Sequence, residues 1–286
     1  MRLLRVGTAR NERPAVLTRD DVLLDVSDVV EDFDEAFWLE GGLRELRHQV
    51  SENESLPWLD ASTVRFGPPI PRPSKIVCVG LNYEDHVRES GAEIPTEPVI
   101  FMKAPNTVVG PNDDIHIPPH AKKTDYEVEL AVVIGEQCRY LPNPEEAMKA
   151  IAGYAISNDV SERAYQLEKG GQWVKGKSFE TFNPLGPFLV TPDELEGPQN
   201  LNLELRVNGN LRQKSNTSLM IFTPPHIVWY ISQFMVLEPG DIVNTGTPPG
   251  VGLGMDPPAY LNPGDTLELS ITGLGRQSQT CVATSP

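Results

Sequence analysis

The segment from Asp125 to Gly135, with the sequence DYEVELAVVIG, constrains the fold more than any other part of the chain. Its branched and aromatic residues predict a β-strand over residues 126–134, in which successive side chains point to opposite faces. One face then carries Tyr126, Val128, Leu130 and Val132. The other face carries Glu127 and Glu129, about 7 Å apart along the strand, and continues with Ala131 and Val133. This apolar continuation indicates a strand inside a core.

Two carboxylates that face an interior repel each other and lose hydration unless a cation neutralises them. From the spacing of Glu127 and Glu129 alone, an edge strand with its acidic face in solvent is the simpler interpretation. The apolar continuation of that face raises the support for a metal site to the same level. A third carboxylate, Asp159, lies where the segment 154–163 runs from a short strand into a predicted helix. Aspartate is also a favoured N-cap at such a place. Ligands that are all oxygen would suit Mg²⁺, Ca²⁺ or Mn²⁺ rather than zinc.

The charge of the chain argues against several classes of partner. Its 286 residues include 24 Lys and Arg and 40 Asp and Glu, which gives a formal net charge of −16. A phosphate backbone repels such a chain, and no cluster of Lys and Arg offsets the repulsion, so we expect no nucleic-acid partner. The longest apolar run, Leu130 to Ile134, is far too short to span a membrane. The first residues lack the apolar region of a signal peptide. These features predict a cytoplasmic protein.

Proline and glycine divide the chain into short elements. There are 27 Pro and 23 Gly, which favours short strands and many turns over a helical bundle. The proline-rich segment 66–73 cannot continue a helix or a central strand, and it predicts a boundary between a small α/β unit of residues 1–70 and a second domain of residues 71–286. We expect strands at residues 3–6, 15–17, 22–26, 75–79, 98–102, 126–134, 186–190, 201–207, 241–244 and 266–271. We expect helices at residues 34–50, 82–91, 144–151, 159–169 and 223–235. The second domain is therefore predicted to be α+β and mostly β.

One predicted helix carries a candidate catalytic pair. The segment 80–91 has Asn82 as a helix cap, acidic residues in its first turn and a closing glycine. His86 and Glu89 are three residues apart on one face, so the carboxylate can orient the imidazole and support it as a base. A surface helical pair is the alternative that this spacing leaves open. Lys177 gives no signal by itself, because most lysines are solvated.

Taken in order, these motifs resemble those of the fumarylacetoacetate hydrolase family, over about two-thirds of the chain. The matching segments are Gly80-Leu81-Asn82-Tyr83 with His86 and Glu89, then Glu127-Val128-Glu129, Asp159, Gly176-Lys177-Ser178-Phe179 and Thr245-Gly246-Thr247-Pro248-Pro249-Gly250-Val251-Gly252. Each segment is a weak signal alone, and their shared order is specific. Within the family, the chain looks most similar to the fumarylacetoacetate hydrolase domain-containing proteins and bacterial diketo-acid hydrolases.

The resemblance implies a fold, a metal site and a set of roles. The fold is a β-rich sandwich or roll, commonly a homodimer, with a small extra N-terminal domain in longer members. The metal, Mg²⁺ with Mn²⁺ or Ca²⁺ as substitutes, corresponds to the three carboxylates of Glu127, Glu129 and Asp159. The catalytic dyad corresponds to His86 and Glu89 on a lid helix, and the active-site lysine to Lys177. Positions near the bound acid correspond to Arg163, Gln166 and Thr247.

The function implied is a Mg²⁺-dependent hydrolase that cleaves a C–C bond in a small 2,4-dioxo acid of the acylpyruvate type, through a metal-stabilised enolate. Three carboxylates contribute about −3, while a divalent cation, Lys177 and Arg163 contribute about +4, so the site would favour a small anionic oxo-acid. The same enolate serves oxaloacetate decarboxylases, tautomerases and 2-hydroxyhepta-2,4-diene-1,7-dioate isomerases, which stay open as alternatives. A metal-dependent acid-binding protein is the non-enzymatic alternative, and the complete dyad argues against it.

Overall fold

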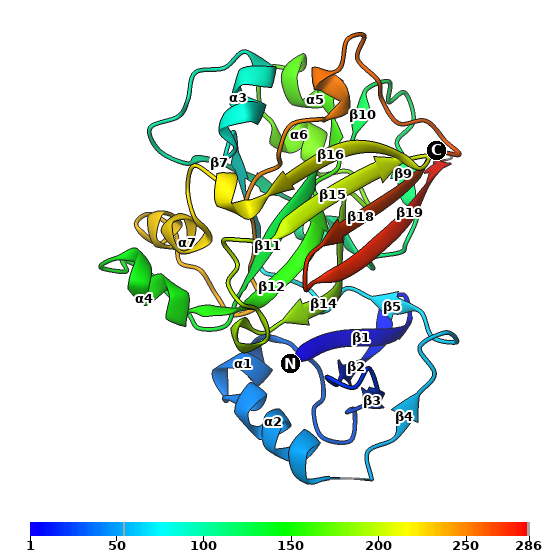
Figure 1. Ribbon diagram of the computed structural model, residues 1–286, viewed down its shortest axis with the longest axis vertical. Coiled ribbons are helices and arrows are strands. Elements are labelled where there is room, and N and C mark those ends of the chain that lie inside the picture. The colour runs from blue at the N-terminus through cyan, green and yellow to red at the C-terminus, as the bar shows by residue number, and fades with distance from the viewer. Residues whose placement is uncertain (54, 285–286) are drawn as a thin grey trace.

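The computed structural model describes residues 1–53 and 55–284. Most of its regular structure is β, and Figure 1 shows the elements. The strands are β1 Arg2–Thr8, β2 Asn11–Leu17, β3 Leu23–Asp25, β4 Trp58–Leu59, β5 Phe66–Gly67, β6 Ile76–Gly80, β7 Val99–Lys103, β8 Val108–Val109, β9 Ile115–Ile117, β10 Thr124–Asp125, β11 Val128–Ile134, β12 Ile151–Asn158, β13 Ser161–Glu162, β14 Asn183–Val190, β15 Asn202–Val207, β16 Asn210–Asn216, β17 Ile242–Asn244, β18 Thr266–Ile271 and β19 Gly275–Ala283.

Two sheets hold most of these strands. The larger sheet has the order β4-β3-β2-β1-β14-β12-β11-β17-β6-β7, with β5 beside β1 and β8 beside β14. The smaller sheet has the order β16-β15-β18-β19-β9. Strands of the first seventy residues thus extend the larger sheet, because β1 pairs with the C-terminal end of β14. The mostly β, α+β fold predicted from the sequence is confirmed.

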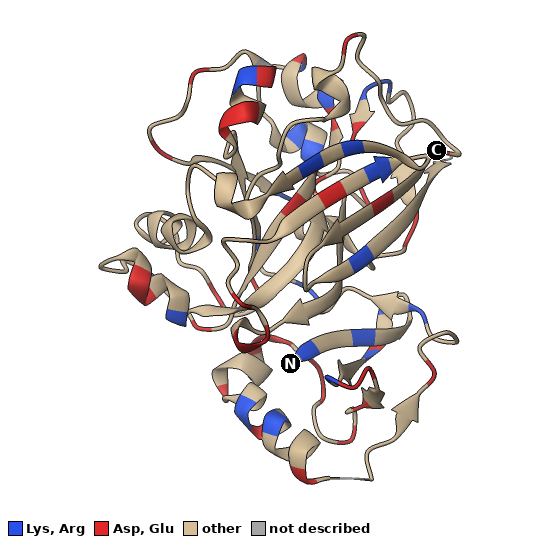
Figure 2. Ribbon diagram, in the orientation of Figure 1, with Lys and Arg blue, Asp and Glu red and all other residues tan. Residues whose placement is uncertain are grey.

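The seven α-helices in the described ranges are short. They are α1 Glu35–Leu39, α2 Gly42–Glu52, α3 Glu84–Ser90, α4 Pro144–Lys149, α5 Arg163–Leu167, α6 Val174–Lys177 and α7 Pro224–Ser232, and four 3₁₀ turns lie at Pro105–Thr107, Pro192–Glu194, Thr217–Leu219 and Gly252–Gly254. None of the helices in these ranges has the length and apolar content that a membrane span requires. Figure 2 shows Lys and Arg interspersed with Asp and Glu over both the upper and the lower part of the molecule.

Both faces of the central strand β11 are buried, as its sequence predicts. Side chains of Val128, Leu130 and Val132 join the core that fills the space between the two sheets. Ala131 and Val133 point the other way, into a second core that α1 and α2 cover from the far side. The strand lies between β12 and β17, so its acidic face is not the solvent-exposed face of an edge strand.

Two predicted helix starts are wrong, and tertiary contacts explain both. Asp159 does not cap a helix over residues 159–169, because α5 begins only at Arg163 and its N-cap is Glu162, whose side chain accepts the Ala164 N–H. The N-cap of α3 is Tyr83 and not Asn82. Asn82 instead accepts the Phe222 N–H and donates to two backbone carbonyls. Short polar side chains serve equally well as caps or as long-range clamps, and sequence alone does not distinguish the two.

Candidate active site

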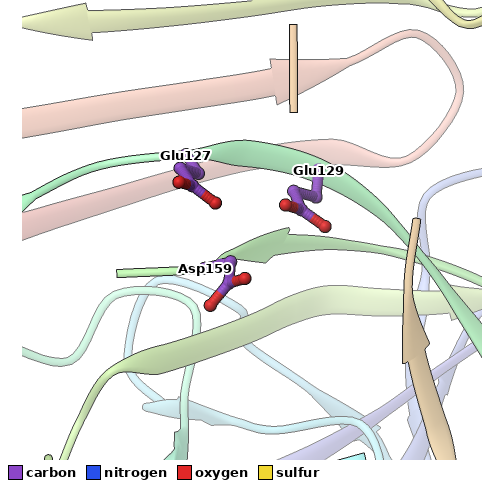
Figure 3. Close-up of side chains that lie close together, drawn as sticks. All are labelled: Glu127, Glu129 and Asp159. Carbon is purple, nitrogen blue, oxygen red and sulfur yellow. The ribbon is translucent and has the colours of Figure 1, made fainter. Parts of the chain in front are cut away.

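The antiparallel pairing of β11 with β12 brings together the three carboxylates predicted as metal ligands. Val128, the first residue of β11, pairs with Asn158, the last residue of β12. Glu127 and Glu129 therefore face Asp159, and one oxygen from each lies within 4.8 Å of the other two. All three side chains are buried. Figure 3 shows the three side chains close together, with Glu127 and Glu129 along one segment and Asp159 below them. We refer to these three residues as the carboxylate cluster.

Two buried lysines contact the carboxylate cluster. Lys177 Nζ donates to Glu127 Oε2 and to Asp159 Oδ2, at 2.8 Å each. Burial alone would lower the pKa of Lys177, but Asp159 and Glu127 outweigh it and raise that pKa, so Lys177 is charged. Lys103, at the end of β7, donates to Asp159 Oδ1 and to the carbonyl of Val160. Lys103 was not predicted, because its contact with Asp159 joins the end of β7 to the residue after β12, and three strands lie between β7 and β12 in the larger sheet.

Removing Lys103 should destabilise the fold. Loss of one partner of a buried ion pair leaves the other charge poorly compensated, so Lys103→Met should lower the free energy of unfolding by about 3 kcal/mol in urea denaturation. The exposed pair of Lys214 with Glu204 supplies the control, because exposed ion pairs contribute little. Lys214→Met should leave the unfolding midpoint unchanged. Equal effects of the two substitutions would contradict a stabilising role for Lys103.

Arg163 connects the carboxylate cluster to the loop 250–254. Its Nε donates to Asp125 Oδ2 at 2.8 Å and its Nη1 donates to Gln166 Oε1 at 2.9 Å. Its Nη2 lies 2.7 Å from Glu127 Oε1 as an ion pair, without hydrogen-bond geometry. Asp125 also accepts two backbone N–H groups of the loop, at 2.7 and 2.9 Å. Asp125, which the sequence analysis did not single out, therefore fixes both the arginine and the loop.

Glu129 is the least compensated member of the carboxylate cluster. It accepts the Gly246 N–H at 2.8 Å, and no Lys or Arg in the described ranges forms an ion pair with it. Burial, followed by the charges of Asp159 and Glu127, raises the pKa of Glu129 well above its usual range. A divalent cation would supply the missing positive charge. The all-oxygen donor set fits Mg²⁺, Mn²⁺ or Ca²⁺.

His86 and Glu89 form the predicted pair on α3. His86 Nδ1 lies 3.0 Å from Glu89 Oε2. The two oxygens of Glu89 also accept the Gly250 N–H, at 3.0 and 3.2 Å. With the imidazole proton on Nδ1 facing the carboxylate, Nε2 is left as the proton acceptor. The pair is therefore tied to the loop 250–254 and is not a surface pair in free solvent.

A cavity of about 450 Å³ joins the dyad to the carboxylate cluster. Eight of the nine residues predicted for the site line it, and these are His86, Glu89, Glu127, Glu129, Arg163, Gln166, Lys177 and Thr247. Asp159 lies behind this wall, fully buried between the two lysines. The structure thus gathers all nine residues at one site, from segments spread between residues 86 and 247.

Thr247 differs from the other lining residues because its hydroxyl is already engaged. Its Oγ1 donates to the carbonyl of Val128 at 3.0 Å and accepts from Gln213 Nε2 at 2.8 Å. Gln213, which is fully buried, also accepts the Val128 N–H. This arrangement holds the glycine-rich loop against the start of β11. Thr247 therefore shapes the cavity through its position. Gln213 is a further residue of the site that was not predicted from the sequence.

Comparison with known proteins gives a consistent picture. The family model described as fumarylacetoacetate (FAA) hydrolase, C-terminal, matches residues 75–282. A 2,4-didehydro-3-deoxy-L-rhamnonate hydrolase from Sphingomonas sp. (strain SKA58) is 45% identical over 281 residues, 98% of this chain and 95% of that protein. The crystal structure of a 2-hydroxyhepta-2,4-diene-1,7-dioate isomerase from Mycobacterium marinum is 32% identical, with a TM-score of 0.76 and 100% of each chain covered. A maleylpyruvate hydrolase from Sphingobium sp. SYK-6, solved with manganese(II) and pyruvate, is 27% identical with a TM-score of 0.82, again over 100% of each chain.

Proposed function

Because the chain belongs to the fumarylacetoacetate hydrolase family, whose members compared above are hydrolases and isomerases, we propose that it hydrolyses a C–C bond in a small 2,4-dioxo acid with the help of a divalent cation, Mg²⁺ first. The observation that supports the proposal is one cavity that His86 and Glu89 line together with Glu127 and Glu129. A cavity lined by both a base and a cation site suits attack by water on an anionic substrate.

The named relatives favour this substrate class. The name of the Sphingomonas protein describes an acid with oxo groups at carbons 2 and 4 and a methylene between them. That arrangement is the 2,4-dioxo pattern in which the bond between carbons 3 and 4 can be cleaved by water. The chain matches that relative over 98% of its length, which supports the same kind of substrate for this chain.

Glu127, Glu129 and Asp159 would hold the cation, which would act as a Lewis acid toward the oxo-acid end of the substrate. The presence of manganese(II) and pyruvate in the Sphingobium structure supports a divalent cation and a 2-oxo acid as ligands of this chain. Arg163 and Lys177 would add positive charge beside the same end of the substrate. Both are charged, since their carboxylate neighbours raise the pKa of each above its usual value despite burial.

His86 is the base of the proposed reaction. It takes a proton from water as the oxygen adds to carbon 4, while Glu89 holds the other ring nitrogen and supports the imidazolium. The bond between carbons 3 and 4 then breaks, which releases a carboxylic acid and the enolate of pyruvate. The proton returns to carbon 3 and completes pyruvate. Lys177 offsets the negative charge that develops on the oxo-acid end.

Pyruvate release tests the proposal. We expect pyruvate from acetylpyruvate in the presence of Mg²⁺ and none with EDTA, with matched reactions lacking the protein. In ¹⁸O-labelled water the acetate formed should carry the label, because the added oxygen stays on the acyl carbon. Pyruvate from oxaloacetate alone would assign the chain to decarboxylation instead. Turnover of a 2-hydroxyhepta-2,4-diene-1,7-dioate without C–C cleavage would assign it to isomerisation, and binding without any turnover would make it an acid-binding protein.

A further inference from the structure

We infer that the substrate has a single carboxylate and an uncharged tail, so that the part beyond the cleaved bond is neutral. The inference rests on the proposed function and narrows it. It separates the chain from enzymes whose substrates carry a second carboxylate at the far end, such as a 1,7-dioate.

The two permanently cationic side chains on the cavity wall, among the described residues, are Arg163 and Lys177. Both are committed to protein carboxylates. Lys177 bridges Glu127 and Asp159, and Arg163 faces Asp125 and Glu127. Whatever positive charge remains lies beside the carboxylate cluster, where the oxo-acid end of the substrate is proposed to bind. A second carboxylate at the other end finds no cation of its own.

The rest of the wall is mainly apolar. It includes Leu81, Leu167, Trp173, Val251 and Leu253. Trp173 stacks edge-to-face on Phe101, with ring centroids 5.2 Å apart. Its ring also lies so close to β6 that a Cβ at Gly80 would come within 2.6 Å of it, which indicates a fixed wall.

A charged tail in this part of the cavity would lose hydration and gain no partner. Partial desolvation of an unpaired carboxylate in such surroundings is unfavourable, and Glu89, itself a carboxylate on the wall, would add repulsion. A methyl, a short alkyl chain or a hydroxyalkyl group would instead bury apolar surface against leucine and tryptophan. The geometry therefore selects substrates by the charge of the tail.

The test compares two acids of equal length that are not cleaved, so that binding is measured apart from the reaction. 2-Oxohexanoate and 2-oxoadipate differ only in a terminal methyl against a terminal carboxylate. Isothermal titration of the full chain with Mn²⁺ present should show 2-oxohexanoate binding at least about tenfold more tightly, the ratio that a modest desolvation cost produces. Equal or tighter binding of 2-oxoadipate would overturn the inference and leave the proposed function standing. Binding of neither acid would overturn both.

A substitution on the cavity wall makes the test specific. Leu167, at the end of α5, is 45% exposed, so arginine fits there without disturbing the core. Leu167→Arg should strengthen 2-oxoadipate binding about fivefold, as a partly exposed ion pair would, and should not strengthen 2-oxohexanoate binding. Leu211→Arg is the matched control, because Leu211 is 44% exposed on β16 and lies away from the cavity wall. A gain for both acids, or an equal gain in the control, would overturn the inference.

Discussion

His86→Ala should lower kcat for acetylpyruvate by about a thousandfold, within the range that a positioned general base contributes. His86 Nδ1 lies 3.0 Å from Glu89 Oε2, which leaves Nε2 free to take a proton from water. Alanine removes the base and leaves the carboxylate cluster, Arg163 and Lys177 untouched. Steady-state assays of pyruvate release, with Mg²⁺ at saturation, measure the effect.

Binding measurements separate this role from a structural one. The titration of His86→Ala with 2-oxohexanoate and Mn²⁺ should give an affinity within about threefold of the wild-type value, because the oxo-acid end is held elsewhere. His116→Ala is the control, since the His116 side chain is 41% exposed on β9 and does not line the cavity. Its kcat should be unchanged. An unchanged kcat in His86→Ala would point to an acid-binding protein, the non-enzymatic alternative.

The carboxylate cluster could be predicted from sequence because two simple rules coincide in it. Alternation along β11 puts Glu127 and Glu129 on one side, and apolar neighbours on the same side exclude a solvent face. Asp159 could be proposed as a third ligand, but its place depends on the register of β11 against β12. Its competing interpretation as a helix cap is wrong, because Lys103 and Lys177 take up its oxygens.

Two strands that were not predicted, β16 and β19, have polar side chains facing inward. In β19 the buried positions include Gln277 and Gln279, which donate to backbone carbonyls such as those of Ile156 and Pro111. In β16 the buried position is Gln213. A glutamine in a strand removes the apolar alternation that identifies the strand. The other sheet and the loops supply the hydrogen bonds that compensate for its burial, so no local pattern reports it.

The turn between β15 and β16, in contrast, can be predicted from the sequence, because its own residues encode it. Asn208 and Gly209 have φ values of 50° and 75°, a left-handed conformation that asparagine and glycine adopt more readily than other residues. The long-range contacts of Lys103, Asp125 and Gln213 have no comparable local signal. What the sequence conveys about the site is thus the ligand chemistry, and what it omits is the set of charges and amides that holds the ligands in place.

Glu129→Gln should abolish the stabilisation that a divalent cation gives to the fold. At a Mn²⁺ concentration of about 100 times its dissociation constant, binding stabilises the native state by about 2.7 kcal/mol. That corresponds to a rise of about 5 °C in Tm for a chain of this size. Loss of one carboxylate of three should weaken binding by more than the 10- to 100-fold that outer-shell partners typically contribute, so the rise should fall below about 1 °C. Differential scanning fluorimetry with and without Mn²⁺ measures both values.

Without the cation, Glu129→Gln should gain stability relative to the wild type as the pH rises, whereas with Mn²⁺ it should lose the stabilisation that the wild type gains. The pKa of Glu129 is raised in the fold, by burial and then by Asp159 and Glu127. The wild-type fold is therefore most stable with respect to this group below the pKa that Glu129 has in the unfolded chain. That stability is lost as the pH rises toward the pKa of Glu129 in the folded chain. Glutamine stays neutral, so with EDTA the Tm of Glu129→Gln relative to the wild type should increase between pH 5 and pH 8.

Glu136→Gln makes the same chemical change at an exposed position and should keep the full Mn²⁺ response. A wild-type Tm that does not move over millimolar Mn²⁺ would contradict the cation site itself. A full response in Glu129→Gln would instead show that the ion binds without this carboxylate. In that case the raised pKa of Glu129 would mark a neutral acid group that donates a hydrogen bond, and the ligand set would have to be found among Glu127, Asp159 and the substrate.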